Sequence, residues 1–290
     1  MTRTSRTSEP DARGLPFPRV DASFSAHLSA SAYQTLAALV YQHSHIRLGA
    51  DKQTMLANRL RKRLQALGLG CFDEYCAVLR SERGPEEIEH LVDLISTNHT
   101  RFFREPEHFS FLANRVLPEL APRLVAAGSP LRVWSAAASS GEEPYTLAIA
   151  LAEFCRQWPA LDWHVEATDI SHRMLEHARA GIYALDRVPP VFPGIFKRYF
   201  QKGVRAREGT CRVKPELRER VHFQRVNLFQ AEYPVPRDQH VIFCRNVMIY
   251  FDRPMRAGVV GEFERLVGPG CPLFIGHSET LNGIPTRFKT

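Results

Sequence analysis

The chain has 290 residues, which suggests about two domains because a single hydrophobic core stops growing near 250–300 residues. Hydrophobic residues make up 44% and charged residues 24%, as is typical of globular proteins. No stretch approaches the roughly 18–20 apolar residues of a membrane span, and the first 20 residues lack the apolar segment of a secretory signal. We therefore expect a cytoplasmic protein in which residues 1–20 form a disordered tail.

The net charge of +7 is concentrated in two segments. Residues 47–70 carry six Lys or Arg against one acidic residue, and residues 179–225 carry twelve against four. Such patches favour an anionic partner, which is a nucleic acid, a membrane surface or an acidic protein. The six cysteines are scattered and form no C-x-x-C pair, so we expect reduced thiols, no disulfide framework and no metal site.

Residues 21–95 are expected to form a small helical domain. Leu56, Leu60 and Leu64 recur at helical spacing, and Gly68 follows as a helix stop. Pro85, followed by two glutamates, is typical of a helix start.

From residue 96 to residue 290 the pattern changes to strands that alternate with helices. Strands are expected at 131–134, 163–168, 221–226, 241–244 and 273–275, and helices are expected to begin near Pro144, Ser171 and Pro254. This alternation predicts an α/β fold with a doubly wound, mainly parallel sheet. Residues 191–220 interrupt it and are expected to form a small inserted antiparallel β flap.

Small residues follow the first strand in the run S-A-A-A-S-S-G-E-E-P-Y, residues 135–145. They allow a ligand to approach the backbone, at the edge where open α/β sheets bind nucleotides. Glu142 and Glu143 would repel a pyrophosphate, so a cofactor that carries a sulfonium and an amino group fits better. On these residues alone, a simple tight turn is the alternative.

The next two strand ends carry further candidates. Asp169 ends the second strand, where it could accept both ribose hydroxyls or cap the helix that starts at Ser171. Asn227 and Leu228 end the third strand and could contact a cofactor, although, taken singly, a turn asparagine followed by a core leucine is the better prediction.

Polar residues also follow the fourth strand and precede the first. Arg245 and Asn246 lie at the fourth strand end, and Tyr250 would share a face with Asn246 if that turn were helical. The run T-N-H-T-R-F-F-R-E, residues 97–105, suits either the closing of a pocket or the start of a helix.

Six segments occur in order: N-H-T-R-F-F-R, V-W-S-A-A-A-S-S-G-E-E-P-Y, A-T-D-I, V-N-L, F-C-R-N-V-M-I-Y-F and G-H-S-E. Together they resemble the bacterial chemotaxis receptor methyltransferases, the CheR family, over nearly all of residues 25–288. The resemblance implies a class I, Rossmann-like methyltransferase that uses S-adenosylmethionine and releases S-adenosylhomocysteine. It also implies that the substrates are glutamates of methyl-accepting chemotaxis receptors, which become methyl esters.

The resemblance further implies roles for individual residues. The cofactor contacts would come from Asn98, Thr100, Arg104, Ala137, Glu143, Asp169, Asn227, Leu228, Arg245 and Asn246. Glu143 would face the methionine amino group, Asp169 would hold the ribose, and Arg104 and Tyr250 would act in catalysis beside the methyl group. No general base is needed, because a glutamate with a pKa of about 4.3 is already ionised at neutral pH.

The partner is expected to contact the helical domain. Arg59, Lys62 and Arg63 form a stripe opposite the leucine face and lack acidic partners along their own helix. The family's substrates are acidic helical bundles, so the stripe is a candidate receptor-binding surface, with a solvated helix face as the alternative. The β flap is a second candidate contact, for a C-terminal receptor peptide. We expect a monomer that binds neither nucleic acid nor metal.

Two other functions compete with this one. A nucleic-acid methyltransferase would explain the basic patches, but the chain lacks an N/D-P-P-Y-type segment near the fourth strand. A non-catalytic sensor of S-adenosylmethionine is disfavoured because Arg104 and Tyr250 are both present. Family members usually continue past G-H-S-E into a final hairpin of the sheet, whereas this sequence ends at Thr290, so either the sequence is truncated or the last strand is missing.

Overall fold

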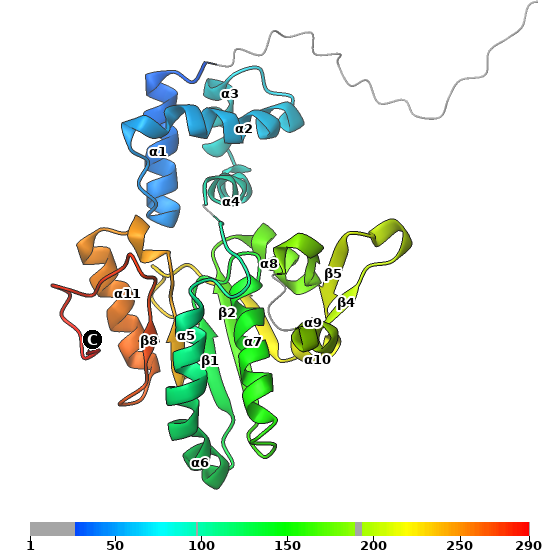
Figure 1. The fold of residues 1–290 in the computed structure, drawn as a ribbon. Coiled ribbons are helices and arrows are strands. Elements are labelled where there is room, and N and C mark those ends of the chain that lie inside the picture. The colour runs from blue at the N-terminus through cyan, green and yellow to red at the C-terminus, as the bar shows by residue number, and fades with distance from the viewer. Residues whose placement is uncertain (1–26, 97, 189–192, 290) are drawn as a thin grey trace, which may run out of the picture.

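A computed structural model describes residues 27–96, 98–188 and 193–289. Figure 1 shows a helical domain that lies over one end of an α/β domain. The predicted tail at residues 1–20 lies outside the described residues. Among the helices of the described ranges, none has the length and apolar character that a bilayer crossing requires.

The helical domain packs around the predicted leucine face. Its elements are α1 (Ala30–Ser44), a 3₁₀ turn (Ala50–Lys52), α2 (Gln53–Leu67), α3 (Phe72–Leu79) and α4 (Gly84–Ile95). Leu56, Leu60 and Leu64 of α2 are fully buried, together with Leu36 and Val40 of α1. Burying a leucine side chain contributes about 1.5–3 kcal/mol, so this face holds the four helices together.

A five-stranded parallel sheet forms the centre of the second domain. Its strands are β1 (Leu131–Ser135), β2 (Trp163–Asp169), β6 (Val221–Arg225), β7 (Val241–Phe243) and β8 (Leu273–Phe274). They lie in the order β6-β2-β1-β7-β8, and Val133 of the central strand pairs with Val165 and Val241. Numbered along the chain, the parallel strands follow the order 3-2-1-4-5.

Helices cover both faces of this sheet. They are α5 (Pro106–Phe111), α6 (Leu117–Ala127), α7 (Glu142–Cys155), α8 (His172–Ala180) and α11 (Arg253–Leu266). Val133 lies in the apolar cluster shared with α5, α6 and α7, whereas its neighbour Trp134 lies in the cluster shared with α11. Because successive strand side chains point to opposite faces, both faces of β1 are buried, as a parallel sheet requires.

The helical segment at 106–127 was not predicted. A π turn (Leu112–Val116) joins α5 to α6, and α6 contains Pro118 in its first turn and Pro122 inside it. Prolines lower the helical signal of a sequence, although a first turn tolerates one because its N–H has no partner within the helix.

The predicted antiparallel flap is present, but it begins earlier in the chain. Strands β3 (Ile182–Ala184), β5 (Thr210–Val213) and β4 (Phe200–Lys202) form a three-stranded sheet in that order, flanked by α9 (Pro193–Tyr199) and α10 (Pro215–Arg218). Strand β3 lies outside the predicted range of 191–220. The fold class is confirmed: a helical domain, a doubly wound parallel sheet and a small antiparallel flap (Figure 1).

Candidate functional site

A pocket lies between the carboxyl ends of the parallel strands and the helical domain. It is an open cleft that, together with the space at its mouth, takes in about 980 Å³. The strand ends supply most of its wall, and Ser44 and Ile46 at the end of α1 supply part of its roof. All eleven residues predicted for cofactor binding or catalysis line it: Asn98, Thr100, Arg104, Ala137, Glu143, Asp169, Asn227, Leu228, Arg245, Asn246 and Tyr250.

The turn after β1 brings the backbone close to this pocket. Gly141 has a φ of 98°, and a Cβ atom there would lie 2.6 Å from the Tyr183 Oη and 2.8 Å from the Ala178 Cβ. Glycine is therefore required, because a side chain would be strained and would clash. The turn positions Ala137 and Ser139 on the pocket wall.

The two glutamates after this turn have different environments. Glu142 is fully buried, pairs with Arg187 at 2.8 Å and accepts a hydrogen bond from Ser140 at 2.6 Å. Only Glu143 lines the pocket, so of the two carboxylates it is the one available to a ligand.

Arg245 holds Glu143 in place. Its side chain is 1% exposed, and its guanidinium donates to Glu143 Oε2 at 2.9 Å and to Glu105 Oε2 at 3.0 Å. Ser135 donates to the other Glu143 oxygen at 2.8 Å. Burial raises the pKa of the Glu143 carboxyl, while Arg245 and Ser135 act in the opposite direction. Arg245 thus borders the pocket mainly as the counter-charge that makes two buried carboxylates tolerable.

Glu105 is a site residue that the sequence analysis did not single out. It accepts from both Arg245 and Asn246, the latter at 3.2 Å, and its side chain is only 12% exposed. Its φ of 56° places it in the left-handed region just before α5. The available signal was weak: an acidic residue before Pro106, at the end of the polar run 97–105.

Of the two alternatives left open for Asp169, the helix cap is wrong, and the ribose contact stays a prediction. Its Oδ2 accepts from the Ser139 N–H at 2.7 Å, and its Oδ1 accepts from the Ser171 N–H at 2.9 Å. The helix cap itself is Ser171, whose hydroxyl accepts from the Met174 N–H at 3.2 Å. Each carboxylate oxygen keeps a second lone pair, so a ribose could still be accepted. Burial raises the pKa of Asp169, and the two backbone N–H groups oppose this.

Asn227 joins the two domains at the pocket. Its side-chain amide donates to the carbonyl of His43 at 2.9 Å and accepts from the Phe229 N–H at 3.1 Å. Arg47 also pairs with Asp252 across the domain boundary at 3.0 Å. Asn227 therefore adopts the turn pattern that was its alternative, while it and the buried Leu228 still line the pocket.

Arg104 and Tyr250 lie at the pocket mouth. The Arg104 side chain is 30% exposed and donates to the His99 carbonyl at 3.0 Å, and Tyr250 is 38% exposed. The expected shared helical face of Asn246 and Tyr250 is wrong. Asn246 has a φ of 59°, and only the 3₁₀ turn Met248–Tyr250 follows, so the chain turns between them.

The structure also corrects the premise that Arg59, Lys62 and Arg63 on α2 form an unpaired basic stripe. Arg63 pairs with the buried Glu87 of α4 at 2.5 Å, and Arg59 donates to the carbonyls of Leu94, Ile95 and Ser96 at the end of α4. Their acidic and carbonyl partners are on another helix, which a search along α2 alone could not find. Lys62 is the member of the stripe that is exposed.

The strand order 3-2-1-4-5, the pocket at the strand carboxyl ends and the acidic residue that ends β2 are features of a Rossmann-like cofactor-binding domain, the fold of class I methyltransferases. Two family models match: "CheR methyltransferase, all-alpha domain" over residues 31–96 and "CheR methyltransferase, SAM binding domain" over residues 98–290. The chain belongs to the CheR family of methyltransferases, and S-adenosylmethionine is its cofactor.

Several relatives agree along most of their length. The chain is 40% identical to the chemotaxis protein methyltransferase of Salmonella typhimurium over 90% of this chain and 88% of that protein. Identity to the Escherichia coli protein of the same name is also 40%, over 90% and 88% of the two chains. Chemotaxis protein methyltransferase 2 of Pseudomonas aeruginosa is 38% identical over 88% of each.

Proposed function

We propose that this enzyme transfers the methyl group of S-adenosylmethionine to glutamate side chains of methyl-accepting chemotaxis receptors in the cytoplasm. The products are glutamate methyl esters and S-adenosylhomocysteine. One observation carries the proposal: the pocket mouth presents Arg104 and Tyr250, a cation and a hydroxyl, where an incoming carboxylate would need charge and hydrogen-bond donors.

The transfer needs no proton acceptor. A carboxylate oxygen donates an electron pair to the methyl carbon, the carbon–sulfur bond breaks, and sulfur keeps that bond's electrons. The two carboxylates in the pocket wall, Glu143 and Asp169, are already held by hydrogen bonds to Arg245, Ser135 and backbone N–H groups. They suit binding of the cofactor's amino group and ribose better than proton transfer. The protein's contribution is positioning, which supplies roughly 7–11 kcal/mol in favourable cases.

The remaining predicted contacts follow from the same arrangement. Asn98 and Thr100 would contact the cofactor, Ala137 would line the small-residue turn beside it, and Asn227 and Leu228 would flank the adenosine. Arg245 and Asn246 would act through Glu143 and Glu105. The enzyme would act as a monomer and would contact the receptor through Lys62 on α2. A C-terminal receptor peptide would pair with one of the edge strands of the β flap, β3 or β4.

The test is methyl labelling of a receptor cytoplasmic fragment with RNA and DNA as competing substrates. Label is expected in the receptor, and mild base should release it as methanol because it is an ester. Replacing the labelled glutamates by glutamine should remove the signal. Base-stable label, or label in nucleic acid, would contradict the proposal.

The mechanism is tested by a pH profile together with Tyr250→Phe. The variant should lower kcat while S-adenosylhomocysteine affinity stays near that of the wild type. A histidine base would impose a limb on kcat/KM near pH 6–7. We expect none, and His99→Ala, which removes the histidine that lines the pocket, serves as the control. A limb that vanishes with His99 would overturn the base-free mechanism.

A further inference from the structure

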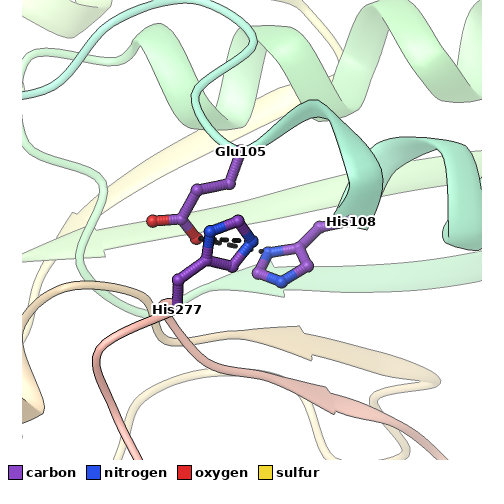
Figure 2. A group of neighbouring side chains, drawn as sticks. All are labelled: Glu105, His108 and His277. Carbon is purple, nitrogen blue, oxygen red and sulfur yellow. Dashed lines mark ion pairs between the residues drawn. The ribbon is translucent and has the colours of Figure 1, made fainter.

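Beside the cofactor pocket, three side chains with lone-pair donors converge on one point. Figure 2 shows the Glu105 carboxylate with the His108 and His277 imidazoles turned toward it. The His108 Nδ1 lies 3.6 Å and the His277 Nε2 lies 4.0 Å from Glu105 Oε2. The two rings are nearly perpendicular, with centroids 5.1 Å apart, so they do not stack against each other.

The fold brings these groups together from two segments distant in sequence. Glu105 immediately precedes α5 and His108 lies in its first turn, three residues further on, which is the spacing of the Glu-x-x-His metal-binding motif. His277 follows β8, in a loop that Glu279 holds in place by accepting from the N–H groups of Gly276, at 2.6 Å, and Asn246, at 2.8 Å.

The hydrogen bonding within the cluster is incomplete. The Nδ1 atom of His108 is buried and has no hydrogen-bond partner, although a carboxylate oxygen lies 3.6 Å away. That separation is too long for a hydrogen bond. A buried polar atom without a partner is unusual and costs free energy, and a cation between the three groups would give this nitrogen a partner.

The local charges favour a dication. Glu105, Glu107 and Glu143 lie near Arg104 and Arg245, which leaves one negative charge in excess if the imidazoles are neutral. Burial lowers the pKa of the His108 imidazole and the Arg245 guanidinium acts in the same direction, while the Glu105 carboxylate opposes both. Burial opposes ionisation of Glu105, but hydrogen bonds from Arg245 and Asn246 bring its pKa below the usual value.

We propose that Glu105, His108 and His277 form a binding site for a transition-metal dication of the Zn²⁺ type. Two imidazoles and one carboxylate are a zinc donor set rather than a magnesium or calcium one. Bond lengths of about 2.0–2.2 Å place tetrahedral ligand atoms about 3.4 Å apart. The three donor atoms lie within 4.8 Å of one another, so small side-chain rotations would close the site. His277 is 58% exposed, which leaves access for the ion and for a water ligand.

The site would be coupled to the cofactor pocket. Glu105 also accepts from Arg245 and Asn246, both of which line that pocket. A metal that draws Glu105 toward the imidazoles weakens these hydrogen bonds. Zinc and S-adenosylhomocysteine should therefore change each other's affinity by the same factor, because linkage is reciprocal.

The experiment titrates the purified full chain, without cofactor, with Zn²⁺ by calorimetry and with Co²⁺ by visible absorption. One equivalent should bind, with the d–d bands of a nitrogen-containing site. His277→Ala should weaken binding roughly tenfold or more, and His108→Gln should do so as well. The matched control is His172→Ala, since His172 is also 58% exposed and lies 3.3 Å from the carboxylate of Glu176.

Absence of stoichiometric binding by the wild type, or equal binding by wild type and His277→Ala, would overturn the site. Equal loss in His172→Ala would show binding to scattered surface histidines and would also overturn it. Circular dichroism and unfolding of each variant keep the outcome independent of folding. Because the readout is metal binding without cofactor or receptor, failure here is distinguishable from failure of the proposed methyl transfer.

Discussion

Each domain contains a network in which an arginine pairs with a carboxylate. The two networks differ in whether their charged groups remain accessible to a ligand. In the helical domain, Arg63 and Tyr75 both hydrogen-bond to the buried Glu87. At the strand ends, Arg245 bridges Glu143 and Glu105, and both carboxylates have further neighbours in or beside a pocket. The first network locks α2, α3 and α4 together. The second holds charged groups ready for a ligand, so similar chemistry serves stability in one place and binding in the other.

The largest effect is expected from Arg245→Met. Among the described residues it removes the one ion-pair partner shown for Glu143, which keeps only its hydrogen bond from Ser135, and it removes the closer of the two arginines beside Glu105. Breaking a buried ion pair in this way costs about 3–5 kcal/mol. Thermal unfolding should show the loss of stability, and calorimetry should show lost S-adenosylhomocysteine binding. A variant with near wild-type stability and affinity would refute the role assigned to this network.

Asp169→Ala tests the binding side of the comparison. It should weaken the binding of S-adenosylhomocysteine by about 1.5–3 kcal/mol, the range for a hydrogen bond to a charged group. The loss has two sources, the ribose contact and the Ser139 N–H that Asp169 holds. Asp169→Asn is the control, because it keeps an acceptor oxygen but removes the charge. Unchanged affinity in a folded Asp169→Ala variant would remove this residue from the site.

Arg63→Ala tests the network around Glu87 in the helical domain. It leaves Glu87 buried without its cation, and because Arg63 is 26% exposed we expect a loss of about 1–3 kcal/mol, below the range for a fully buried pair. S-adenosylhomocysteine affinity should not change. Equal cofactor loss in Arg63→Ala and Arg245→Met would contradict the separation of the two networks.

The network around Glu87 should also make the stability of the fold depend on pH. Burial raises the pKa of Glu87, but hydrogen bonds from Arg63 and Tyr75 outweigh it, so the folded-state pKa lies below the usual value. The resulting stability is present above the unfolded pKa of about 4.3 and is lost as the pH falls through the folded value. The stability difference between wild type and Arg63→Ala should therefore shrink in acid, as urea unfolding at several pH values can measure.

The smallest effect is expected from Lys62→Glu, on the exposed side of α2. It should raise KM for the receptor several-fold and reduce the salt dependence, because rim charges act mainly on association. Stability should stay within about 0.5 kcal/mol, as is usual for surface substitutions. Arg123→Glu on α6 provides an exposed basic residue of the α/β domain, outside both proposed receptor contacts, for comparison. An unchanged KM at low salt would identify the face of α2 as an ordinary solvated helix surface.

The sequence predicted the fold and the pocket better than it predicted the pairing of charges. The parallel strands fell within a residue or two of their predicted bounds, since buried apolar runs and small-residue turns are local signals. The helical segment at 106–127 was missed because its prolines mask the periodicity. Strand β3 was missed because three residues are too few to show an alternation.

For the site, the sequence identified the residues at the strand ends, since parallel strands bring their carboxyl ends to one edge. It could not show which glutamate faces the pocket, because Glu142 and Glu143 are adjacent and only the packing of Arg187 and Arg245 separates them. Nor could it show that Arg59 and Arg63 are engaged, or that Glu105 and His108 meet His277. These contacts join residues between 24 and 172 positions apart. Hydrophobic periodicity is a local property of the sequence, whereas the order of the strands and the partners of buried charges depend on how distant segments pack together.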